Sequence, residues 1–418
     1  MTYDESIEWL YSTQAFGIKL GLENIQRLLG ALDLPGDHAH VLHVAGSNGK
    51  GSTCAFAESI CRHHGLRTGL FSSPHLVRAN ERTRIDFEPV SDDGFVSLAK
   101  EVKAAVDGWD PHPTFFELVL AMALLHFRRE KVDVILLETG MGGRLDATSA
   151  VQSTASAIAP IALDHTHWLG DTLAAIAGEK AGILKPSIPL VVSAQKSEAD
   201  AVIAARAKEL RCPRVVALPE GLPDDLDLGL PGPHQRENAA LALALVAASG
   251  VSLDPDRTRA ALAETSWPAR FQVIELPSRT HPVVIDGAHN PAAAQILVKT
   301  WEQQFPNVRP LLLFAGLDKK DTEGTYRPLS GICHRVILTE TGTGRSTPVS
   351  ELGTMAQKFS APISEISDAR KALSRALEDD SRPLLVAGSL FLAGLVLGEL
   401  EKKTEGTGDD GAYQPSLQ

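Results

Sequence analysis

One short loop constrains the fold of this chain more than any other part of the sequence. Residues 43–54 read HVAGSNGKGSTC and follow the apolar residues Val41 and Leu42. A glycine-rich turn between a buried strand and a helix directs backbone N–H groups and the positive end of the helix at one point. This arrangement suits a phosphate group, and Lys50 adds a full charge. The loop predicts an α/β fold with a phosphate site, and a glycine turn without a ligand is the alternative.

Short apolar runs alternate with helical patterns along most of the chain. The run VDVILLETG at 132–140 ends in a glycine turn, which is typical of a strand buried on both faces of a parallel sheet. The runs at 67–73, 154–163 and 189–194 repeat this signal, and a helical pattern separates the last two. Repeated strand–helix–strand units with right-handed crossovers predict a doubly wound, mostly parallel sheet.

The length of the chain predicts two domains. Its 418 residues exceed the roughly 250 to 300 residues that one hydrophobic core organises. An irregular segment is expected at 219–233, a helix over about 235–249, and a turn-rich zone at 254–282. We therefore expect an N-terminal P-loop ATPase-like domain over 1–267 and a smaller, C-terminal Rossmann-like α/β domain over 268–418. The polar tail from about 404 is expected to be disordered.

Charge and composition exclude several classes of partner. The net charge of -12 comes from 52 acidic and 40 basic side chains without a long basic run, so we expect no nucleic-acid binding. The N-terminus MTYDESIEWL lacks a signal-peptide pattern, and no apolar run reaches about 18 residues. We expect a cytoplasmic protein without membrane contact. Cys54 and Cys61 are expected to be buried on one helix face.

A carboxylate follows one of the predicted strands. Glu138 comes directly after the apolar run 132–137, and open α/β sheets place their ligands at that edge. A carboxylate that faces a phosphate loop needs a cation, and magnesium prefers oxygen ligands. Taken alone, Glu138 is equally well read as a helix-capping or loop carboxylate. His165 ends the run IALDH and is also expected at a strand end, and taken alone it is read as a structural histidine. Taken alone, Lys180 is read as a solvated helix lysine.

The phosphate loop departs from the usual template G-x-x-x-x-G-K-[ST], because Val44 stands at the first glycine position and Gly51 separates Lys50 from Ser52. The form AGSNGKGST resembles the loop of ATP-dependent Mur-type amide ligases, specifically the folylpolyglutamate synthase and dihydrofolate synthase branch. Other segments match from near residue 17 to about residue 395, in the order SSPHL (72–76), NERTRI (80–85), ETGMGGRLDAT (138–148), LDHTHWLG (163–170), EKAGI (179–183), ARFQ (269–272) and DGAHNP (286–291).

This resemblance implies an activity and its cofactors. It implies a ligase that adds L-glutamate to the carboxylate of dihydropteroate, or to the glutamate of a reduced folate, through an acyl phosphate, giving ADP and phosphate. ATP and two magnesium ions are the implied cofactors, a monovalent cation is left open, and a monomer is implied. Whether the chain uses one acceptor or both is also left open.

The resemblance also implies roles for individual residues. Four are implied to be catalytic, namely Lys50, Glu138, His165 and Lys180, and the lysine equivalent to Lys180 is carbamylated in the family. Three are implied to hold magnesium, namely Ser73, Glu138 and His165. The implied nucleotide contacts are Gly46, Ser47, Asn48, Gly49, Lys50, Gly51, Ser52, Thr53, Asn238, Arg270, Asp286 and His289. The implied contacts to the acceptor are Arg82, Thr114, Phe116 and Asp146.

Several alternatives remain at this point. Phe115 and Phe116 are as well explained as core residues, and Arg82 or Arg84 could instead bind a glutamate carboxylate. Ala269 stands where the family usually has glycine, which concerns the turn before Arg270. Two other functions remain, a peptidoglycan-precursor amino-acid ligase and a nucleotide-switch module. The segments SSPHL, NERTRI and LDATS favour the folate branch over both.

Overall fold

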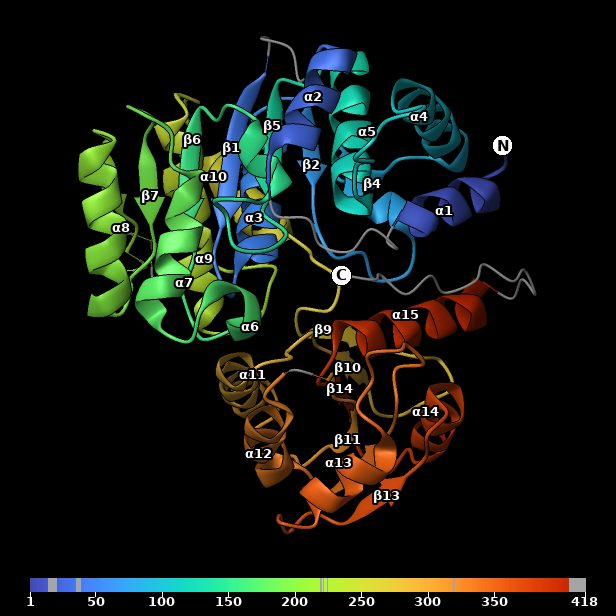
Figure 1. Cartoon of the computed structure of the whole chain (residues 1–418). Coiled ribbons are helices and arrows are strands. Elements are labelled where there is room, and N and C mark those ends of the chain that lie inside the picture. Colours follow the sequence, from blue (N-terminus) through green and yellow to red (C-terminus); the bar gives the residue numbers. More distant parts are fainter. Residues whose placement is uncertain are drawn as a thin grey trace. The chain divides into compact units, whose positions relative to one another are not determined.

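The computed structural model describes residues 1–13, 21–34, 39–218, 220, 222–223, 225–318 and 320–405. These residues form two compact units (Figure 1). The first comprises 1–73, 79–229 and 236–265, and the second comprises 74–78, 230–235 and the chain from 266 onward. Two early segments thus group with the C-terminal unit. The motif match near residue 17 and the tail from 406 lie outside the described residues, and the last helix continues to Glu405.

An eight-stranded sheet forms the centre of the first unit. Its strand order is β4-β3-β2-β5-β1-β6-β7-β8, with parallel pairing from β2 to β8 and an antiparallel edge made by β3 and β4. This confirms the predicted doubly wound, mostly parallel sheet. The strands are β1 (His40–Ala45), β2 (Thr68–Phe71), β3 (Thr83–Ile85), β4 (Glu88–Pro89), β5 (Val134–Glu138), β6 (Ala155–Ile158), β7 (Leu190–Val192) and β8 (Arg214–Val216).

The strand order fixes where a ligand site lies. From β1 the chain first builds toward β2 and later toward β6, so the carboxyl end of β1 is a topological switch point. Open α/β sheets bind ligands at such points, because the loops on the two sides diverge and leave a crevice. The loops after β1, β2, β5 and β6 all leave this edge of the sheet.

Helices cover the sheet of the first unit, and the core residues show how. Ile135 and Leu137 of β5 belong to a core cluster with side chains of α5, whereas Val134 and Leu136 alternate to the opposite face. The helices are α1 (Tyr3–Ser12), α2 (Glu23–Leu32), α3 (Lys50–His63), α4 (Asp92–Ala105), α5 (Phe115–Arg129), α6 (Thr166–Leu169), α7 (Leu173–Lys180), α8 (Ser197–Glu209), α9 (His234–Ala248) and α10 (Pro255–Glu264).

Helix α10 lies in the zone at 254–282 that the sequence analysis read as turn-rich, so that interpretation was wrong. Asp254 accepts a hydrogen bond from the N–H of Arg257, and Pro255 occupies the first helical turn. Both are typical helix-start signals that the many polar residues of the zone concealed. Cys54 and Cys61 of α3 are fully buried, as predicted.

The second unit has a six-stranded sheet in the order β13-β12-β11-β14-β10-β9, parallel except for the edge strand β9. Its strands are β9 (Gln272–Ile274), β10 (Val283–Ile285), β11 (Leu311–Phe314), β12 (Arg335–Leu338), β13 (Ile363–Glu365) and β14 (Leu384–Ala387). Its helices are α11 (Pro291–Gln304), α12 (Thr322–Ile332), α13 (Val349–Ala356), α14 (Ala369–Glu378) and α15 (Leu390–Glu405).

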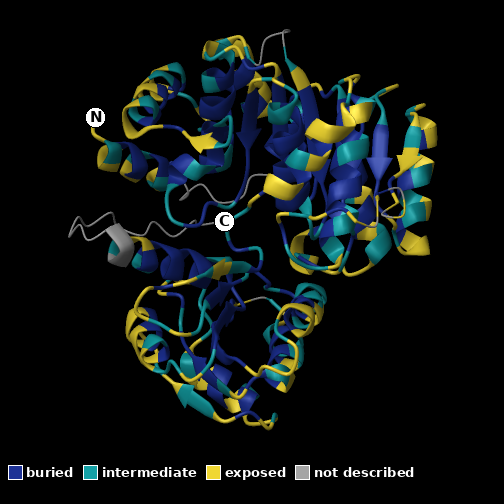
Figure 2. Cartoon of the chain, turned by 180° about the vertical axis from the view of Figure 1, so that it is seen from behind, coloured by how far each residue is buried: buried dark blue, intermediate teal, exposed yellow. Residues whose placement is uncertain are grey.

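Alternate residues of these strands pack on opposite helix layers. Leu311 and Leu313 of β11 join the core under α14 and α15, whereas Leu312 and Phe314 join the core under α11, α12 and α13. The strands are therefore apolar on both faces, as in other parallel sheets covered by helices. Figure 2 shows the sheets of both units as mainly buried, with exposed residues concentrated on the outer sides of helices and in loops.

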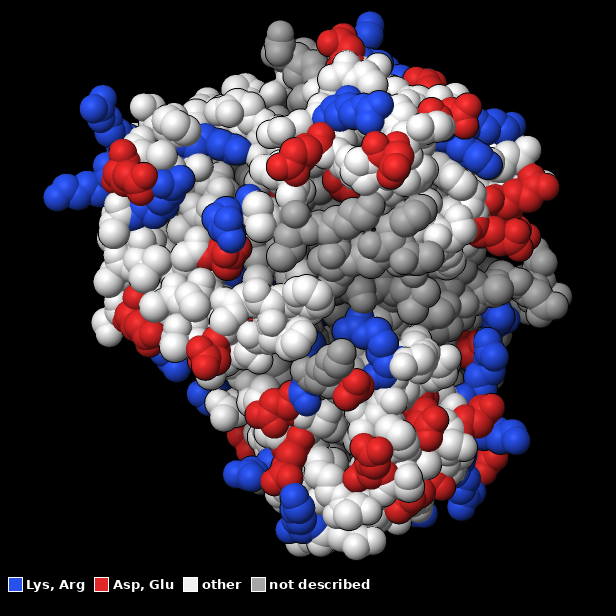
Figure 3. Space-filling model, in the orientation of Figure 1, with Lys and Arg blue, Asp and Glu red and all other residues white. Residues whose placement is uncertain are grey.

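Charged side chains of both signs are interspersed over the face seen in Figure 3. The chain carries 40 basic and 52 acidic residues, so neighbouring charges are of mixed sign. Among the described residues, no helix combines the length and apolar character needed to cross a membrane.

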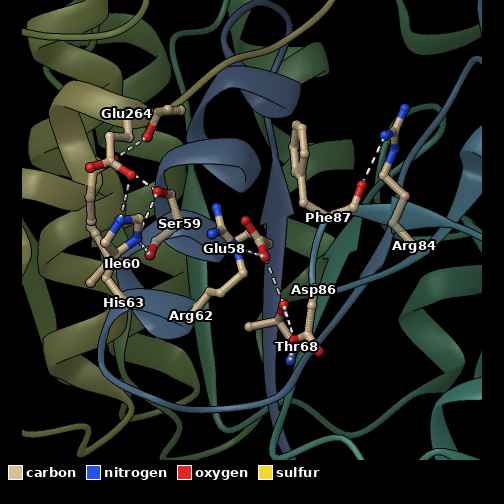
Figure 4. Close-up of polar contacts among 12 residues, drawn as sticks. Glu58, Ser59, Ile60, Arg62, His63, Thr68, Arg84, Asp86, Phe87 and Glu264 are labelled. Carbon is tan, nitrogen blue, oxygen red and sulfur yellow. Dashed lines mark hydrogen bonds and ion pairs between the residues drawn. The ribbon is translucent and has the colours of Figure 1, made fainter.

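A buried glutamate ties α3 to the sheet (Figure 4). Glu58 Oε1 accepts hydrogen bonds from Arg62 Nε at 3.0 Å and from Thr68 Oγ1 at 2.7 Å. Glu58 is fully buried, and burial raises the pKa of its carboxyl although both hydrogen bonds lower it. On its other side α3 is held to α10, because Ser59 Oγ donates to the carbonyl of Ala261 at 2.8 Å.

We predict that Glu58→Gln gains stability relative to the unchanged chain as pH rises. The fold holds the Glu58 proton more tightly than the unfolded chain does, so the native protein loses stability as pH rises above the ordinary value of 4.5. Glutamine keeps an oxygen acceptor and has no such loss. Urea unfolding from pH 4.5 to about 8 measures the difference. Glu8→Gln, a change at an exposed position, is the control. The prediction is contradicted if the free energy of unfolding of Glu58→Gln, minus that of the unchanged chain, stays constant or falls as pH rises.

Candidate active site

The phosphate loop occupies the switch point at the end of β1. Gly46 has φ 156°, and a Cβ atom on it would lie 2.7 Å from the Cβ of Ala159. Gly49 has φ 85°, and a Cβ atom on it would lie 2.3 Å from Asn238 Oδ1. Both positions therefore require glycine. The predicted nucleotide contact Asn238 is thereby placed directly against the loop.

The loop is anchored to the segment that follows β6. The hydroxyl of Ser47 donates to the carbonyl of Ala162 at 2.8 Å, and the N–H groups of Ser47 and Asn48 donate to the carbonyl of Pro160 at 3.0 and 3.3 Å. Helix α3 begins at Lys50, with Gly51, Ser52 and Thr53 in its first turn. The free N–H groups of a first helical turn point toward the loop and can bind an anion.

Two lysines converge on the first carbonyl of the loop. Lys50 Nζ donates to the carbonyl oxygen of Gly46 at 3.1 Å and to that of Ser47 at 3.4 Å. Lys180 Nζ, from the last turn of α7, donates to the same Gly46 oxygen at 2.8 Å. Lys180 is only 4% exposed, so its interpretation as a solvated helix lysine was wrong. The two ammonium groups give this end of the sheet a positive charge that favours an anion.

Two buried hydroxyl groups beside the loop fit a magnesium ion. The side-chain oxygens of Thr53 and Ser73 are buried and have no hydrogen-bond partner among the described residues. The N–H of Ser73 donates to Glu138 Oε2 at 3.1 Å, so one of these hydroxyls belongs to a residue that contacts a buried carboxylate. Burying a hydroxyl without a partner costs about 1–3 kcal/mol, which a ligand would recover.

Protein groups alone do not form a metal cage. Within the described ranges, no three or more His, Cys, Asp or Glu side chains group so as to hold an ion. Magnesium does not need such a cage, because it usually keeps several waters and takes one or two protein oxygens together with substrate phosphates. Ser73 and Glu138, which contact each other, are of the kind that supply the protein's share of such a site.

The surroundings of Cys54 show that Glu138 and Lys50 both act on the first turns of α3. Burial raises the pKa of the Cys54 thiol well above 9.0, the Glu138 carboxylate raises it further, and the Lys50 ammonium opposes the rise. Glu138 ends β5, as the sequence predicted, and is 5% exposed. The Lys50 ammonium and the Glu138 carboxylate thus both lie near the first turns of α3.

His165 does not end a strand, contrary to the sequence analysis. Strand β6 stops at Ile158, and His165 lies seven residues later, just before α6, with φ 51°. Its N–H donates to Asp164 Oδ1 at 2.8 Å, and its Nε2 lies 3.8 Å from Asp164 Oδ2. The sequence analysis missed Asp164, a buried carboxylate, although its place after a predicted strand was the signal that identified Glu138.

The predicted acceptor residues fall into two groups. Phe116 and Asp146 flank Gly140, since a Cβ atom there would lie 2.8 Å from the Phe116 ring and 3.2 Å from Asp146 Oδ2. Thr114 instead caps α5, with its hydroxyl accepting from the N–H of Glu117 and donating to the Glu117 carboxylate. The structure therefore brings Phe116 and Asp146 together and uses the Thr114 hydroxyl in a capping box.

The carboxylate of Asp146 organises its own loop. Oδ2 accepts from the N–H of Met141 at 2.9 Å, and Oδ1 accepts from the N–H and the hydroxyl of Thr148 at 3.0 and 2.5 Å. Burial raises the pKa of Asp146, and these hydrogen bonds oppose the rise. Sequence reasoning missed these contacts, because an Asp two residues before a Thr is a common local pattern.

The two arginines of the 80–85 segment differ in their surroundings. Arg82 is 1% exposed, its guanidinium lies 5.1 Å from the centre of the Phe115 ring, and burial lowers its pKa to about 10. Arg84 donates to the carbonyl of Phe87 at 3.0 Å, within its own hairpin (Figure 4). It also donates to the carbonyl of Glu81, just before that hairpin, at 3.2 Å. Arg82 is the better placed of the two for a role near Glu138, whose charge affects its pKa.

The second unit brings together its own predicted residues. Asp286 Oδ2 and Oδ1 accept from the N–H groups of Phe271 and Ala288, each at 2.8 Å, and burial raises its pKa against the opposing charges of Arg270 and His289. Ala269 adopts φ 55°, a left-handed conformation that glycine adopts without strain. The turn before Arg270 thus has a left-handed backbone, which glycine adopts most readily.

Comparisons with known proteins show which family this chain resembles. A family model described as the Mur ligase, glutamate ligase domain matches residues 269–390. The dihydrofolate synthase/folylpolyglutamate synthase of Bacillus subtilis is 32% identical over 93% of this chain and 97% of that protein. The chain is also similar to the E. coli FolC structure with DHPP and ADP, with a TM-score of 0.85, 30% identity and coverage of 96% and 98%.

A further solved structure holds a nucleotide and a metal. This chain is similar to the bifunctional folylpolyglutamate synthase/dihydrofolate synthase of Yersinia pestis complexed with AMPPNP and a Mn ion. The TM-score is 0.85 at 32% identity, and the match covers 96% of this chain and 98% of that chain.

We predict that Ser73→Ala leaves stability unchanged or raises it by up to about 1 kcal/mol, because it removes a buried hydroxyl without a partner. The magnesium concentration needed for nucleotide binding should rise about tenfold or more. Calorimetric titration of ADP at increasing magnesium concentration measures this requirement. Ser72→Ala is the matched control, since the Ser72 hydroxyl contacts the carbonyl of Glu81. An unchanged magnesium requirement in Ser73→Ala removes Ser73 from the metal site.

Proposed function

Because this chain belongs to the dihydrofolate synthase/folylpolyglutamate synthase family of Mur-type ligases, we propose that it performs both glutamate additions of that family. The chain is an ATP-dependent ligase that joins glutamate to folates. The proposed acceptors are the carboxylate of dihydropteroate and the glutamate of a reduced folate. The observation that carries the proposal is the convergence of Lys50 and Lys180 on the Gly46 carbonyl, at the strand edge that also holds Glu138.

The reaction needs an activated carboxylate and no enzyme nucleophile. An oxygen of the acceptor carboxylate attacks the γ-phosphorus of ATP, which breaks the bond to ADP and gives an acyl phosphate. The amine of L-glutamate then attacks the acyl carbon, the tetrahedral intermediate collapses, and inorganic phosphate leaves with the former carboxylate oxygen. Lys50 and the N–H groups of the loop stabilise the charge that builds on the transferred phosphoryl group.

The metal ions are proposed to lie where the buried oxygens of Ser73 and Glu138 meet the phosphates. Bound there, magnesium would neutralise phosphate charge. ATP and a divalent metal ion are supported by the solved relatives, whereas a second magnesium held by His165 and a monovalent cation are proposals. The backbone of 46–53 and Asn238 are proposed to bind the nucleotide, and the nucleotide contacts of Arg270, Asp286 and His289 stay predictions of the sequence.

Other features of the proposal rest on the sequence. We propose a cytoplasmic monomer with a functional division at 267/268 into an ATP- and folate-binding domain and a ligase domain. A peptidoglycan-precursor ligase and a nucleotide-switch module are disfavoured by the similarity to folate enzymes over nearly the whole chain. Both rivals also predict no turnover that depends on a pterin or folate acceptor together with glutamate.

We predict that Lys180 carries a carbamate in the active enzyme. The Lys180 ammonium first loses a proton, and the lone pair of the neutral Nζ then forms a bond to the carbon of CO2 while a second proton leaves the nitrogen. A buried cation beside Gly46 thereby becomes a carbamate anion able to face magnesium. Carbon NMR with 13C-bicarbonate should show a carbamate signal that Lys180→Arg loses together with activity. Lys185→Arg is the control, because burial lowers the pKa of Lys185 and so makes it a competing amine. A fully active enzyme without the signal contradicts the prediction.

The acceptor assignment is tested by ADP release with ATP, magnesium and L-glutamate, comparing dihydropteroate with tetrahydrofolate. We predict turnover with both. Asp146→Ala should lower the use of dihydropteroate about tenfold or more, because a buried, charge-assisted contact is worth about 1.5–3 kcal/mol. The KM for ATP should change little. Asp107→Ala, an exposed change, is the control, and glutamylation of tetrahydrofolate alone would refute the claim of two activities.

A further inference from the structure

A histidine lies in the middle of the strand that leads into the phosphate loop. His43 is fully buried in β1, among the apolar residues Val41, Leu42 and Val44. Its Nε2 lies 2.8 Å from Thr148 Oγ1 and 3.1 Å from Thr139 Oγ1. One threonine directly follows the metal-site carboxylate of β5, and the other belongs to the loop organised by Asp146.

The contacts of Thr148 determine which atom is the donor between His43 Nε2 and Thr148 Oγ1. The single hydroxyl proton of Thr148 is donated to Asp146 Oδ1 at 2.5 Å, and the same oxygen accepts the N–H of Thr148 at 3.0 Å. Thr148 Oγ1 must therefore accept from His43, so Nε2 carries the proton. Burial lowers the pKa of His43 to about 3, and the Lys185 ammonium adds to this, so the ring is neutral.

This tautomer leaves Nδ1 as a bare acceptor. Nδ1 is buried, and none of the described residues donates a hydrogen bond to it. An apolar side chain would fill the same place in an otherwise apolar strand without burying an unpaired nitrogen. Histidine is therefore a poor choice for stability at this position, and its use is explained by what Nε2 does.

We propose that His43 is a positioning residue for the acceptor substrate, which rests on the function proposed above. Its Nε2–H fixes the Thr148 hydroxyl, and the fixed hydroxyl orients the Asp146 carboxylate beside Phe116. The contact with Thr139 ties the same ring to the end of β5. His43 thus fixes the position of residues 140–148, called the acceptor loop here, relative to the end of the strand that carries Glu138.

The nucleotide side does not depend on the His43 ring in the same way. Strand β1 is held by backbone pairing with β5 on one side and β6 on the other, and the phosphate loop is anchored by Ser47. The acceptor loop has the backbone bonds Arg144 N–H to Glu179 and Asp146 N–H to Gly143, but it does not pair with neighbouring strands as β1 does. Side chains add the Asp146 carboxylate on the Met141 N–H and the Ser149 hydroxyl on the carbonyl of Gly143. Loss of the ring should therefore affect the acceptor loop first.

Two substitutions at His43 separate the role of Nε2 from the volume of the ring. In His43→Gln the side-chain nitrogen can reach the place of Nε2, whereas in His43→Asn it reaches only the place of Nδ1. We expect His43→Asn to raise the KM for dihydropteroate about tenfold, with the KM for ATP within about threefold and His43→Gln close to the unchanged chain. Thr148→Val removes the hydroxyl that connects His43 to Asp146, so it should raise the KM for dihydropteroate as much as His43→Asn does. Thr148→Ser keeps the hydroxyl and is the control.

Hydrogen exchange of the ligand-free protein gives a readout that does not depend on activity. Amides of 139–150 should exchange faster in His43→Asn and Thr148→Val, while those of α3 stay unchanged. If the unchanged chain does not use dihydropteroate, the proposed function fails while the exchange data still test the positioning role. The proposal is overturned if amide exchange in 139–150 is unchanged in these variants, or if the KM values for dihydropteroate and ATP rise equally in His43→Asn. It is also overturned if His43→Gln shows the same defect as His43→Asn. Should His43→Asn not fold, Thr148→Val decides alone.

Discussion

Two lysine ammonium groups share the carbonyl oxygen of Gly46, and much of the first unit serves to hold them there. Lys50 reaches it because α3 begins immediately after a loop that only glycines at 46 and 49 can form. Lys180 reaches it from the end of α7, 134 residues later in the sequence. Like charges this close are tolerated at a buried place only where anions accompany them or where one of the charges is removed. Bound phosphates, Glu138 and the proposed carbamate on Lys180 would meet this requirement.

The parallel sheet makes this gathering of charges possible. Four neighbouring strands, β2, β5, β1 and β6, end at one edge and deliver Ser73, Glu138, the phosphate loop and the segment that anchors it. The central strands are mainly apolar on both faces, so most polar groups of the candidate site lie where the strands stop. His43 is buried inside β1, as Ser156 is inside β6, and the hydrogen bonds of His43 run toward the loops that follow β5. The proposed acceptor loop and the proposed metal ligand Glu138 are thus neighbours along one short stretch of chain.

The sequence predicted the fold class because its main signals are local and periodic. The glycine loop and the apolar runs identify β1, β2, β5, β6 and β7 of the first sheet, whereas the short strands β3, β4 and β8 were not predicted. Glu138 could be placed at a strand end by counting residues. Helix α10 was missed, since its polar first turn resembles a loop. His165 was misplaced because the apolar run continues past Ile158, where pairing with neighbouring strands stops. The burial of Lys180 beside Gly46 depends on chain segments that folding brings together, which spacing does not reveal. Asp164 followed a predicted strand, as Glu138 did, and was overlooked, whereas the contacts of Asp146 were hidden in a common local pattern.

The central claim is that the loop at 46–53 activates a carboxylate by phosphoryl transfer, and an isotope measurement tests it most directly. Dihydropteroate labelled with 18O in its carboxylate is converted with ATP and L-glutamate, and the inorganic phosphate released is analysed by mass spectrometry. An acyl-phosphate route moves one labelled oxygen from each acceptor molecule into the phosphate. Release of unlabelled phosphate during product formation would show that the carboxylate never attacked ATP and would contradict the account.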